Sequence, residues 1–397
     1  MNLNDLLKTT AEKKASDLHV KVGVPPILRI DGRLAPIETE KRTTQEEALT
    51  VALSIMNNTQ KLRFKEKNEL DMAYAVPWLG RFRVNVFQQR GSVGMVFRMV
   101  PGKIANFEDL MMPAVLQKIA SEQRGLILVT GTTGSGKSTT LAAMIDYINT
   151  SRTANIITIE DPIEFLHRDK KSIVNQREIG SDTFSFSEAL RSALRQDPDV
   201  ILVGEMRDFE TISTALTAAE TGHLVLSTLH TLDAAETVNR IITVFPPYQQ
   251  KQVRMQLASV IKGIVSQRLV PRADGTGRVP AVEVMLGTLS VREAIIDDAK
   301  TRQIPTIISG GMAHYGMQTF DQSLLMLYKK DYITYEEALV TASNPDDFAL
   351  KVKGIQSTSD LTWEAEDKSK SSTKPEAGSP QKPGDMKEFK IDRFGDK

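Results

Sequence analysis

A glycine-rich segment that ends in a lysine and a serine has the clearest chemical meaning in this sequence. Gly131, Gly136, Lys137 and Ser138 match the pattern G-x-x-x-x-G-K-[ST], whose glycines let backbone N–H groups turn toward phosphate oxygens. A lysine in this place reaches the β- and γ-phosphates of a nucleotide, and the serine hydroxyl offers a ligand to Mg²⁺. We therefore predict a site for ATP and Mg²⁺. The residues predicted to contact the nucleotide are Thr132, Thr133, Gly134, Ser135, Gly136, Lys137, Ser138 and Thr139.

Acidic residues follow two apolar runs that have the length of buried strands. Residues 200–203 lead to Glu205, at the carboxyl end of a strand, where ligands of open α/β sheets bind. Glu205 is predicted to hold Mg²⁺ through water or to orient a water for attack. Residues 156–159 lead to Glu160 and Glu164, either of which is a candidate general base. The sequence does not choose between these two, and a solvated acidic loop is the competing interpretation.

Two histidines flank a third apolar run, residues 224–227. His230 follows this run, where a polar side chain can sense the terminal phosphate of a nucleotide. His223 stands at its start. Both are candidate site residues, although a lone histidine is more often a structural group.

Arginines of an earlier strand are candidates for neutralising phosphate charge. Apolar and polar residues alternate along residues 80–89, which puts Arg81 and Arg83 on the same face of a strand. Arginines that stabilise a transferring phosphate commonly come from a neighbouring domain or subunit. A solvated strand face is an equally good interpretation. Arg195 and Arg207, each near an acidic motif, are further candidates.

The order of the elements that must position these groups predicts an α/β fold. From residue 114 onward strands alternate with helices, which is typical of a parallel sheet. We predict a small α+β domain over residues 1–100, a linker over 101–113, an ATPase domain over 114–356 and a disordered tail over 357–397. Helices are predicted over residues 3–14, 44–56, 139–149, 187–196, 208–221, 233–244, 249–269, 290–298, 319–329 and 335–342.

Composition excludes several classes of function. The chain of 397 residues has a formal net charge of +0 and no cysteine, which excludes disulfides and thiolate chemistry and gives no bulk attraction to nucleic acid. No apolar run approaches the length of a membrane-spanning helix, and residues 1–14 lack the features of a secretory signal. We expect a cytoplasmic protein that neither binds nucleic acid nor inserts into a membrane.

These motifs, taken in order, resemble the PilT-type retraction ATPases of bacterial type IV pili, within the secretion-superfamily ATPases. The resemblance covers residues 3–355. It is carried by SDLHVKVGVPPILRIDG at 16–32, GRFRVNVFQQRG at 80–91, GTTGSGKS at 131–138, EDPIEF at 160–165, LVGEMRD at 202–208, AAETGHLVLSTLHT at 218–231 and GMQTFDQSL at 316–324.

The resemblance implies a PAS-like first domain, a RecA-like ATPase domain and a homohexameric ring. ATP would sit between the two domains, near arginines of the first. Hydrolysis would move an inner-membrane platform protein, so that the ring works at the inner-membrane face of the pilus machine and pilin subunits are extracted. The site residues implied by the resemblance are Lys137, Ser138, Glu164, Glu205, His223 and His230.

One stretch departs from the family pattern and leaves alternatives open. The family carries A-I-R-N-L-I-R-E, which is needed for retraction, where this chain has SVREAIID at 290–297, so that Ile296 replaces the second arginine. An accessory retraction paralogue is therefore an alternative. A pilus-assembly or type II secretion ATPase is another, but it usually has a four-cysteine zinc site and a long extra N-terminal region. A non-hydrolysing regulator and a nucleic-acid motor are the remaining alternatives.

Overall fold

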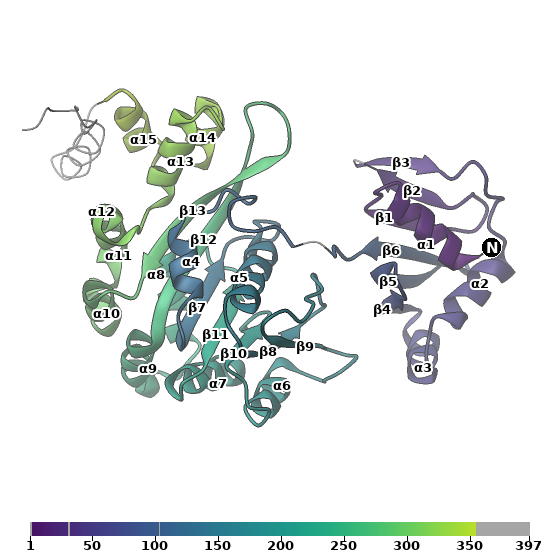
Figure 1. Cartoon of the computed structure of the whole chain (residues 1–397), viewed down its shortest axis with the longest axis horizontal. Coiled ribbons are helices and arrows are strands. Elements are labelled where there is room, and N and C mark those ends of the chain that lie inside the picture. Colours follow the sequence, from purple (N-terminus) through teal and green to yellow (C-terminus); the bar gives the residue numbers. More distant parts are fainter. Residues whose placement is uncertain (1, 31, 103, 355–397) are drawn as a thin grey trace, which may run out of the picture. The chain divides into compact units, whose positions relative to one another are not determined.

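Figure 1 shows the chain as a computed structural model, which describes residues 2–30, 32–102 and 104–354. The predicted disordered tail, residues 357–397, lies outside the described residues. Within the described part, no helix has the length and apolar character needed to cross a bilayer.

The first hundred residues build a six-stranded sheet in which neighbouring strands are antiparallel. Its strands are β1 (Asp17–Val20), β2 (Ile27–Ile30), β3 (Arg33–Pro36), β4 (Glu69–Val76), β5 (Gly80–Gln89) and β6 (Ser92–Met99). Their order across the sheet is β3-β2-β1-β6-β5-β4. In β5, Phe82, Val84 and Val86 are buried, because alternate side chains of a strand point to the same face. They belong to a hydrophobic core of this sheet and its helices.

Three helices pack beside this sheet: α1 (Leu3–Glu12), α2 (Gln45–Ser54) and α3 (Asn58–Lys67). The sequence predicts the first two. Thr44 and Glu47 form the reciprocal capping box that begins α2. Asn57 and Gln60 form a second box that begins α3, a helix that the sequence analysis missed. The PAS-like character of this part, and the domain boundaries, stay predictions.

The second sheet has seven strands in the order β13-β12-β7-β11-β10-β8-β9. These are β7 (Gly125–Thr130), β8 (Asn155–Glu160), β9 (Ile173–Glu178), β10 (Val200–Val203), β11 (Leu224–Leu229), β12 (Ile261–Pro271) and β13 (Arg278–Leu286). All neighbours are parallel except β12 and β13. Every residue of β7 and β11 is buried, as expected of strands covered on both faces. The predicted α/β fold with a mostly parallel sheet is confirmed.

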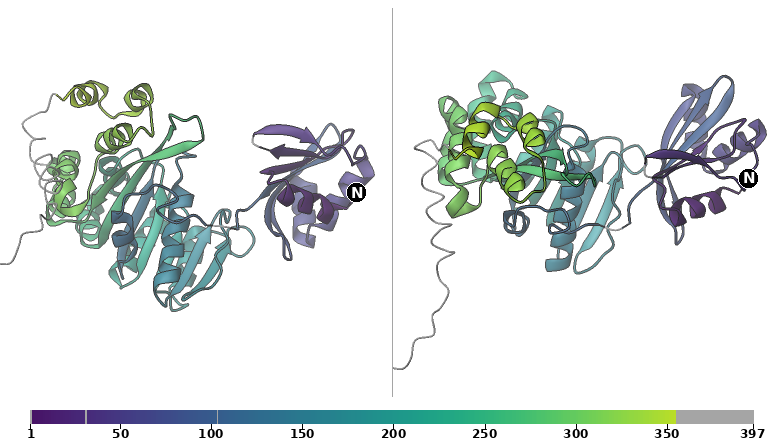
Figure 2. Two further views of the ribbon diagram at one scale, coloured as in Figure 1. Left: turned by 45° about the horizontal axis from the view of Figure 1, so that its top comes forward. Right: turned by 90° about the horizontal axis from the view of Figure 1, so that it is seen from above.

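Helices cover this sheet, as Figures 1 and 2 show. They include α4 (Val115–Ala120), α5 (Lys137–Ser151), α6 (Phe186–Ala193), α7 (Phe209–Glu220), α8 (Ala234–Thr243) and α9 (Pro247–Val260). Both α5 and α7 contact β7 and β11, whereas α6 contacts β8 and β10, and α8 contacts β12 and β13. The helices therefore bury the apolar strands while leaving the strand ends accessible.

The prediction of one long helix over residues 249–269 is wrong. The helix α9 ends at Val260, and the strand β12 begins at the next residue and pairs in parallel with β7. Ile261, Ile264 and Val265 are all fully buried, and their spacing fits a helix as well as a buried strand. The segment forms a strand because it pairs with β7. The local sequence pattern contains no information about that partner.

The chain then returns through a group of short helices. They are α10 (Leu289–Ile296), the 3₁₀ helix η1 (Asp298–Gln303), α11 (Ile304–Gly310), α12 (Met312–Tyr315), α13 (Phe320–Lys329), α14 (Tyr335–Thr341) and α15 (Pro345–Val352). The predicted helices over 290–298, 319–329 and 335–342 match α10, α13 and α14.

Candidate nucleotide site

The loop between β7 and α5 has the backbone of a phosphate-binding loop. Gly131, Gly134 and Gly136 all have positive φ angles, of 140°, 80° and 95°, which side chains other than glycine rarely tolerate. A Cβ on Gly131 would lie 2.5 Å from the carbonyl oxygen of Gln267, so glycine is also required sterically. Gly136 caps α5 without any side-chain hydrogen bond. The first N–H groups of α5 are therefore free to bind an anion.

Lys137 is held inside this loop. Its Nζ donates hydrogen bonds to the carbonyl oxygens of Gly131, at 2.8 Å, and Thr132, at 2.9 Å. The side chain is nearly buried, and burial lowers the pKa of Lys137, opposed by the nearby carboxylates of Glu164 and Glu205. A buried cation that is bonded to carbonyl oxygens gains from an added phosphate charge.

A cavity of about 560 Å³ opens at the carboxyl ends of the parallel strands. It is large enough for a nucleotide. Among the predicted site residues, those that line it are Thr133, Gly134, Gly136, Lys137, Ser138, Thr139, Glu160, Glu164, Glu205, Arg207 and His230. Two others are near: Thr132 accepts from Lys137, and Ser135 has a buried hydroxyl without a partner among the described residues. An unpaired buried hydroxyl fits a site that an added ligand completes.

Glu205 lies where β10 and β11 end. Its Oε2 is 3.6 Å from Nε2 of His230 and 2.7 Å from Nη2 of Arg207. The hydroxyl of Thr228 donates to the carbonyl oxygen of Gly204 at 2.6 Å, which ties the two strand ends together. Glu205, His230 and Arg207 thus form one polar cluster beside the phosphate-binding loop.

The two acids after β8 differ in their surroundings. Glu160 is half-buried, and its Oε1 accepts hydrogen bonds from Thr158 at 2.6 Å and Gln176 at 3.1 Å. Burial raises the pKa of Glu160, and the nearby charge of Glu164 adds to this effect. Glu164 is exposed in the cavity. A general base needs access to water, so this geometry favours Glu164.

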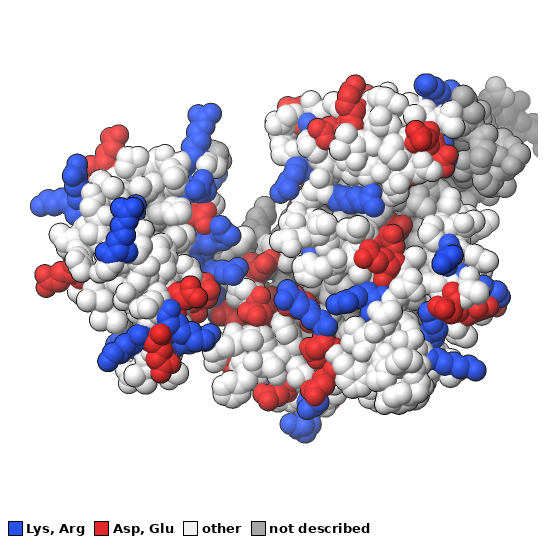
Figure 3. All heavy atoms as spheres, turned by 180° about the vertical axis from the view of Figure 1, so that it is seen from behind, with Lys and Arg blue, Asp and Glu red and all other residues white. Residues whose placement is uncertain are grey.

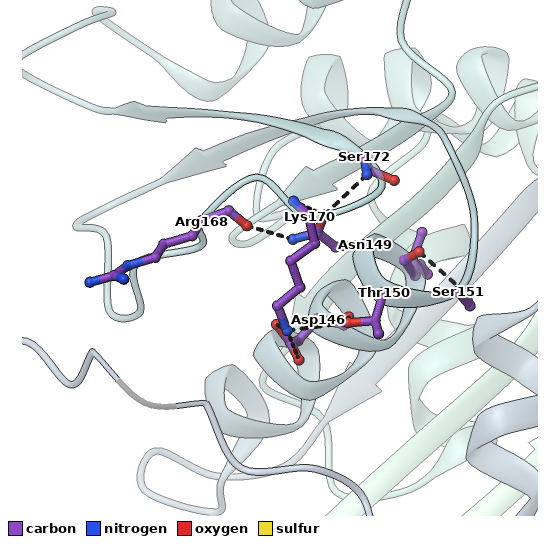
Figure 4. A network of polar contacts seen from close by, with 8 residues as sticks. Asp146, Asn149, Thr150, Ser151, Arg168, Lys170 and Ser172 are labelled. Atoms are coloured by element: carbon purple, nitrogen blue, oxygen red, sulfur yellow. Dashed lines mark hydrogen bonds and ion pairs between the residues drawn. The ribbon is translucent and has the colours of Figure 1, made fainter.

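Arg168 and Lys170, which follow the acidic segment, are bound to the helix α5, as Figure 4 shows. The buried side chain of Asn149 donates to the carbonyl oxygen of Arg168 at 2.8 Å and accepts from the N–H of Lys170 at 3.1 Å. Lys170 also forms an ion pair with Asp146 at 2.7 Å. The helix that begins at Lys137 therefore also holds the far end of the acidic segment.

The structure leaves four of the predicted residues away from this cavity. His223 precedes β11 at the amino end of the strand, and its Nδ1 is 2.9 Å from the carbonyl oxygen of Ala218. Arg81 forms an ion pair with Glu178 at 2.9 Å. The residues that line the cavity do not include His223, Arg81, Arg83 or Arg195.

Sequence reasoning missed two polar residues of the cavity. Arg278 begins β13 and lines the cavity, but the sequence analysis found neither β12 nor β13 and so no hairpin that would bring it there. His167 follows the acidic segment and also lines the cavity, and burial lowers its pKa to about 4. His167 could have been identified from the sequence, because it lies two residues after Phe165 in the segment that follows β8.

In the part of the chain that the structure describes, the distribution of charge over the surface does not point to a further binding site. Basic and acidic side chains of the described residues are interspersed over the face shown in Figure 3. This mixed surface is in line with the formal net charge of +0 for the whole sequence.

A phosphate-binding loop between a buried parallel strand and a helix, with acids at the ends of neighbouring strands, defines a P-loop ATPase of the α/β class. The family model of the type II/IV secretion system protein matches residues 1–325. The chain therefore belongs to this family, and it is an ATPase.

Individual relatives show which members of this family the chain is similar to. The chain is 47% identical to the type IV pilus retractation ATPase PilT of Pseudomonas aeruginosa, over 88% of this chain and 100% of that protein. It is 43% identical to the type IV pilus ATPase PilU of the same organism, over 91% and 94%. A crystal structure of the pilus retraction motor PilT with bound ADP matches with a TM-score of 0.82 and 46% identity, over 87% and 98%. The predicted PilT-type ATPase is confirmed.

Proposed function

We propose that this chain is a motor ATPase that hydrolyses ATP to drive retraction of a type IV pilus. The observation that carries the proposal is the convergence of Lys137, Glu205 and His230 on one cavity from three adjacent parallel strands. The names of the relatives support the cellular role, since one is a retractation ATPase and a solved structure of a retraction motor holds ADP.

The residues of this chain have separable roles in hydrolysis. The loop N–H groups and Lys137 bind the phosphates, and Lys137 balances negative charge in the transition state. The hydroxyl of Ser138 and, through water, the carboxylate of Glu205 would hold Mg²⁺, which would neutralise phosphate charge; both residues line the cavity. Glu164 orients and deprotonates the attacking water. His230 beside Glu205 senses the presence of the terminal phosphate.

The arginines and His223 require an assembly to act on the nucleotide. Arg81 is paired with Glu178 in this structure, so it reaches phosphate only after that pair opens. We infer a homohexameric ring, in which the domain of residues 1–100 supplies Arg81 and Arg83 near ATP at the interface with the ATPase domain of residues 114–356. We place His223 near a neighbouring subunit. The ring works on the cytoplasmic face of the inner membrane, against a platform protein of the pilus machine.

One observation supports the alternative of an accessory retraction paralogue. Ile296, at the end of α10, is 48% exposed, and the family pattern has an arginine at this position. An exposed isoleucine cannot make the ionic contacts of an arginine. The higher identity to the retractation ATPase favours the main proposal.

Deletion of the gene in its own organism tests the proposal. A strain that lacks a retraction motor is expected to carry excess surface pili and to lose twitching motility, and the wild-type gene but not Lys137→Ala restores both. Bald cells would instead indicate an assembly ATPase. Unchanged piliation and motility would contradict a role as the main motor and favour the accessory paralogue.

A further inference from the structure

A buried carboxylate outside the nucleotide cavity joins two of the segments that form it. Glu283 lies on β13, opposite Ser266 of β12, and is 5% exposed. Its Oε1 accepts a hydrogen bond of 2.8 Å from the backbone N–H of Ala234, the first residue of α8. A carboxylate at the start of a helix is stabilised by the helix dipole.

The second contact of Glu283 leads to the phosphate-binding loop. Ser266 lies directly opposite Glu283 in the register of β12 and β13 and lowers the pKa of its carboxyl group. The hydroxyl of Ser266 accepts a hydrogen bond of 3.0 Å from the hydroxyl of Thr130. Thr130 is the last residue of β7, and Gly131 follows it directly. Glu283 is therefore connected, through its cross-strand neighbour Ser266, to the residue that immediately precedes the loop.

The first contact leads to His230. The segment between β11 and α8 is bound to the first turn of this helix, because Thr231 shares a hydrogen bond of 2.6 Å with Thr237 and the N–H of Leu232 donates to Glu236 at 2.7 Å. A displacement of the start of α8 would therefore displace His230 relative to Glu205.

We propose that Glu283 is a positioning residue for ATP hydrolysis, which fixes the segment carrying His230 in register with the phosphate-binding loop. Glu283 does not line the cavity, so it acts through its two contacts and not on the nucleotide. The proposal rests on the ATPase activity proposed above.

The charge environment makes this contact sensitive to pH. Burial raises the pKa of Glu283 to about 7, with the charge of Asp233 at the start of α8 adding to the effect, and the Ala234 hydrogen bond, Arg268 and Ser266 opposing it. Arg268 also lies near Asp321. The ionised carboxylate is the stronger acceptor. We therefore expect kcat to rise from about pH 6 to about pH 8, the range over which a carboxyl group with this pKa becomes ionised.

Three variants test the proposal on the purified full-length protein, with kcat and KM for ATP measured from pH 6 to 8. Glu283→Ala removes both contacts and is expected to lower kcat about tenfold while changing KM and ADP affinity less than about twofold. Glu283→Gln keeps an acceptor oxygen but not the ionisation, so it is expected to abolish the rise of kcat with pH.

The matched control is Asp17→Asn. Asp17 is 3% exposed, and it belongs to the first sheet. Burial raises its pKa, but Ser16 and Arg98 outweigh this effect and hold the pKa below its usual range. This control is expected to keep the wild-type pH profile.

Three results would overturn the proposal. They are wild-type kcat in Glu283→Ala, an unchanged pH profile in Glu283→Gln, and loss of nucleotide binding and thermal stability in proportion to kcat. If Glu283→Ala does not fold, the pH profile of Glu283→Gln decides. An inactive wild-type protein would contradict the proposed function itself.

Discussion

The two ends of the parallel strands in the seven-stranded sheet carry similar residue types in very different situations. At the carboxyl ends, Lys137 follows the loop after β7, Glu205 follows β10 and His230 follows β11, and all three face one cavity. Their charges are only partly compensated by the protein. A bound ligand of opposite charge would therefore stabilise the charged side chains at this end of the sheet.

At the amino ends, polar groups satisfy one another. Asp199, which precedes β10, accepts from the backbone N–H of Asn155 at 2.8 Å. Lys262 forms an ion pair with Glu122 at 3.0 Å. His223 contacts a carbonyl oxygen. The comparison teaches that, within one subunit, strand polarity and not residue type separates the groups that line the cavity from the groups that are paired with one another.

The largest expected effect comes from the lysines at the two ends. Lys137→Ala removes the cation that we propose binds the phosphates, so we expect kcat to fall by about 10³-fold or more. Lys262→Ala removes a cation at the opposite end and is expected to change kcat less than about twofold. Steady-state ATPase assays measure both. Equal losses in the two variants would break the comparison.

The acids that flank β10 give the next largest effect. Glu205→Gln keeps the size of the side chain but loses its charge, so kcat is expected to fall about 10²-fold while ATP binding is retained. Asp199→Asn keeps an oxygen that can accept from Asn155, and we expect wild-type turnover. Nucleotide binding by fluorescence titration is measured beside kcat. Unchanged turnover in Glu205→Gln would remove Glu205 from the mechanism.

The histidines at the two ends of β11 sharpen the comparison. His230→Asn is expected to lower kcat about tenfold. This is the change expected when one hydrogen bond to the reacting group is lost in the transition state. His223→Asn is expected to have an effect below about twofold in dilute protein, where subunits are separate. If His223→Asn lowers kcat only in the assembled ring, this histidine acts across a subunit interface.

The smallest expected effect concerns stability. The pKa of Glu283 is about 7 in the folded protein, above its ordinary value of 4.5. Between these values the folded chain binds this proton more tightly than the unfolded chain, so the free energy of unfolding falls as pH rises from 4.5 to 7. Glutamine does not ionise, so the free energy of unfolding of Glu283→Gln does not fall in this way. Relative to the wild type, the melting temperature of Glu283→Gln is therefore expected to rise by about a few degrees from pH 5 to pH 8. A difference that is constant with pH would contradict the assigned pKa.

Much of the site could be predicted because its parts are local in the sequence. The glycines, Lys137 and Ser138 are contiguous, and their conformation follows from backbone sterics and the start of α5. Glu205 and His230 follow apolar runs that can be recognised as buried strands. Since parallel strands end at the same edge of a sheet, the sequence also predicts that these groups converge.

Tertiary pairing decided the rest. The run from Ile261 becomes a strand because β7 offers it a partner, and only then does the hairpin bring Arg278 to the cavity and Glu283 to the start of α8. Likewise, the carboxylate of Glu160 is held by Gln176 of the neighbouring strand β9, a partner 16 residues further along the chain. The sequence by itself determined the phosphate-binding loop and the alternation of the strands β7, β8, β10 and β11 with helices. Contacts between distant segments decided which charged groups line the cavity, because burial and pairing depend on neighbours that local patterns do not specify.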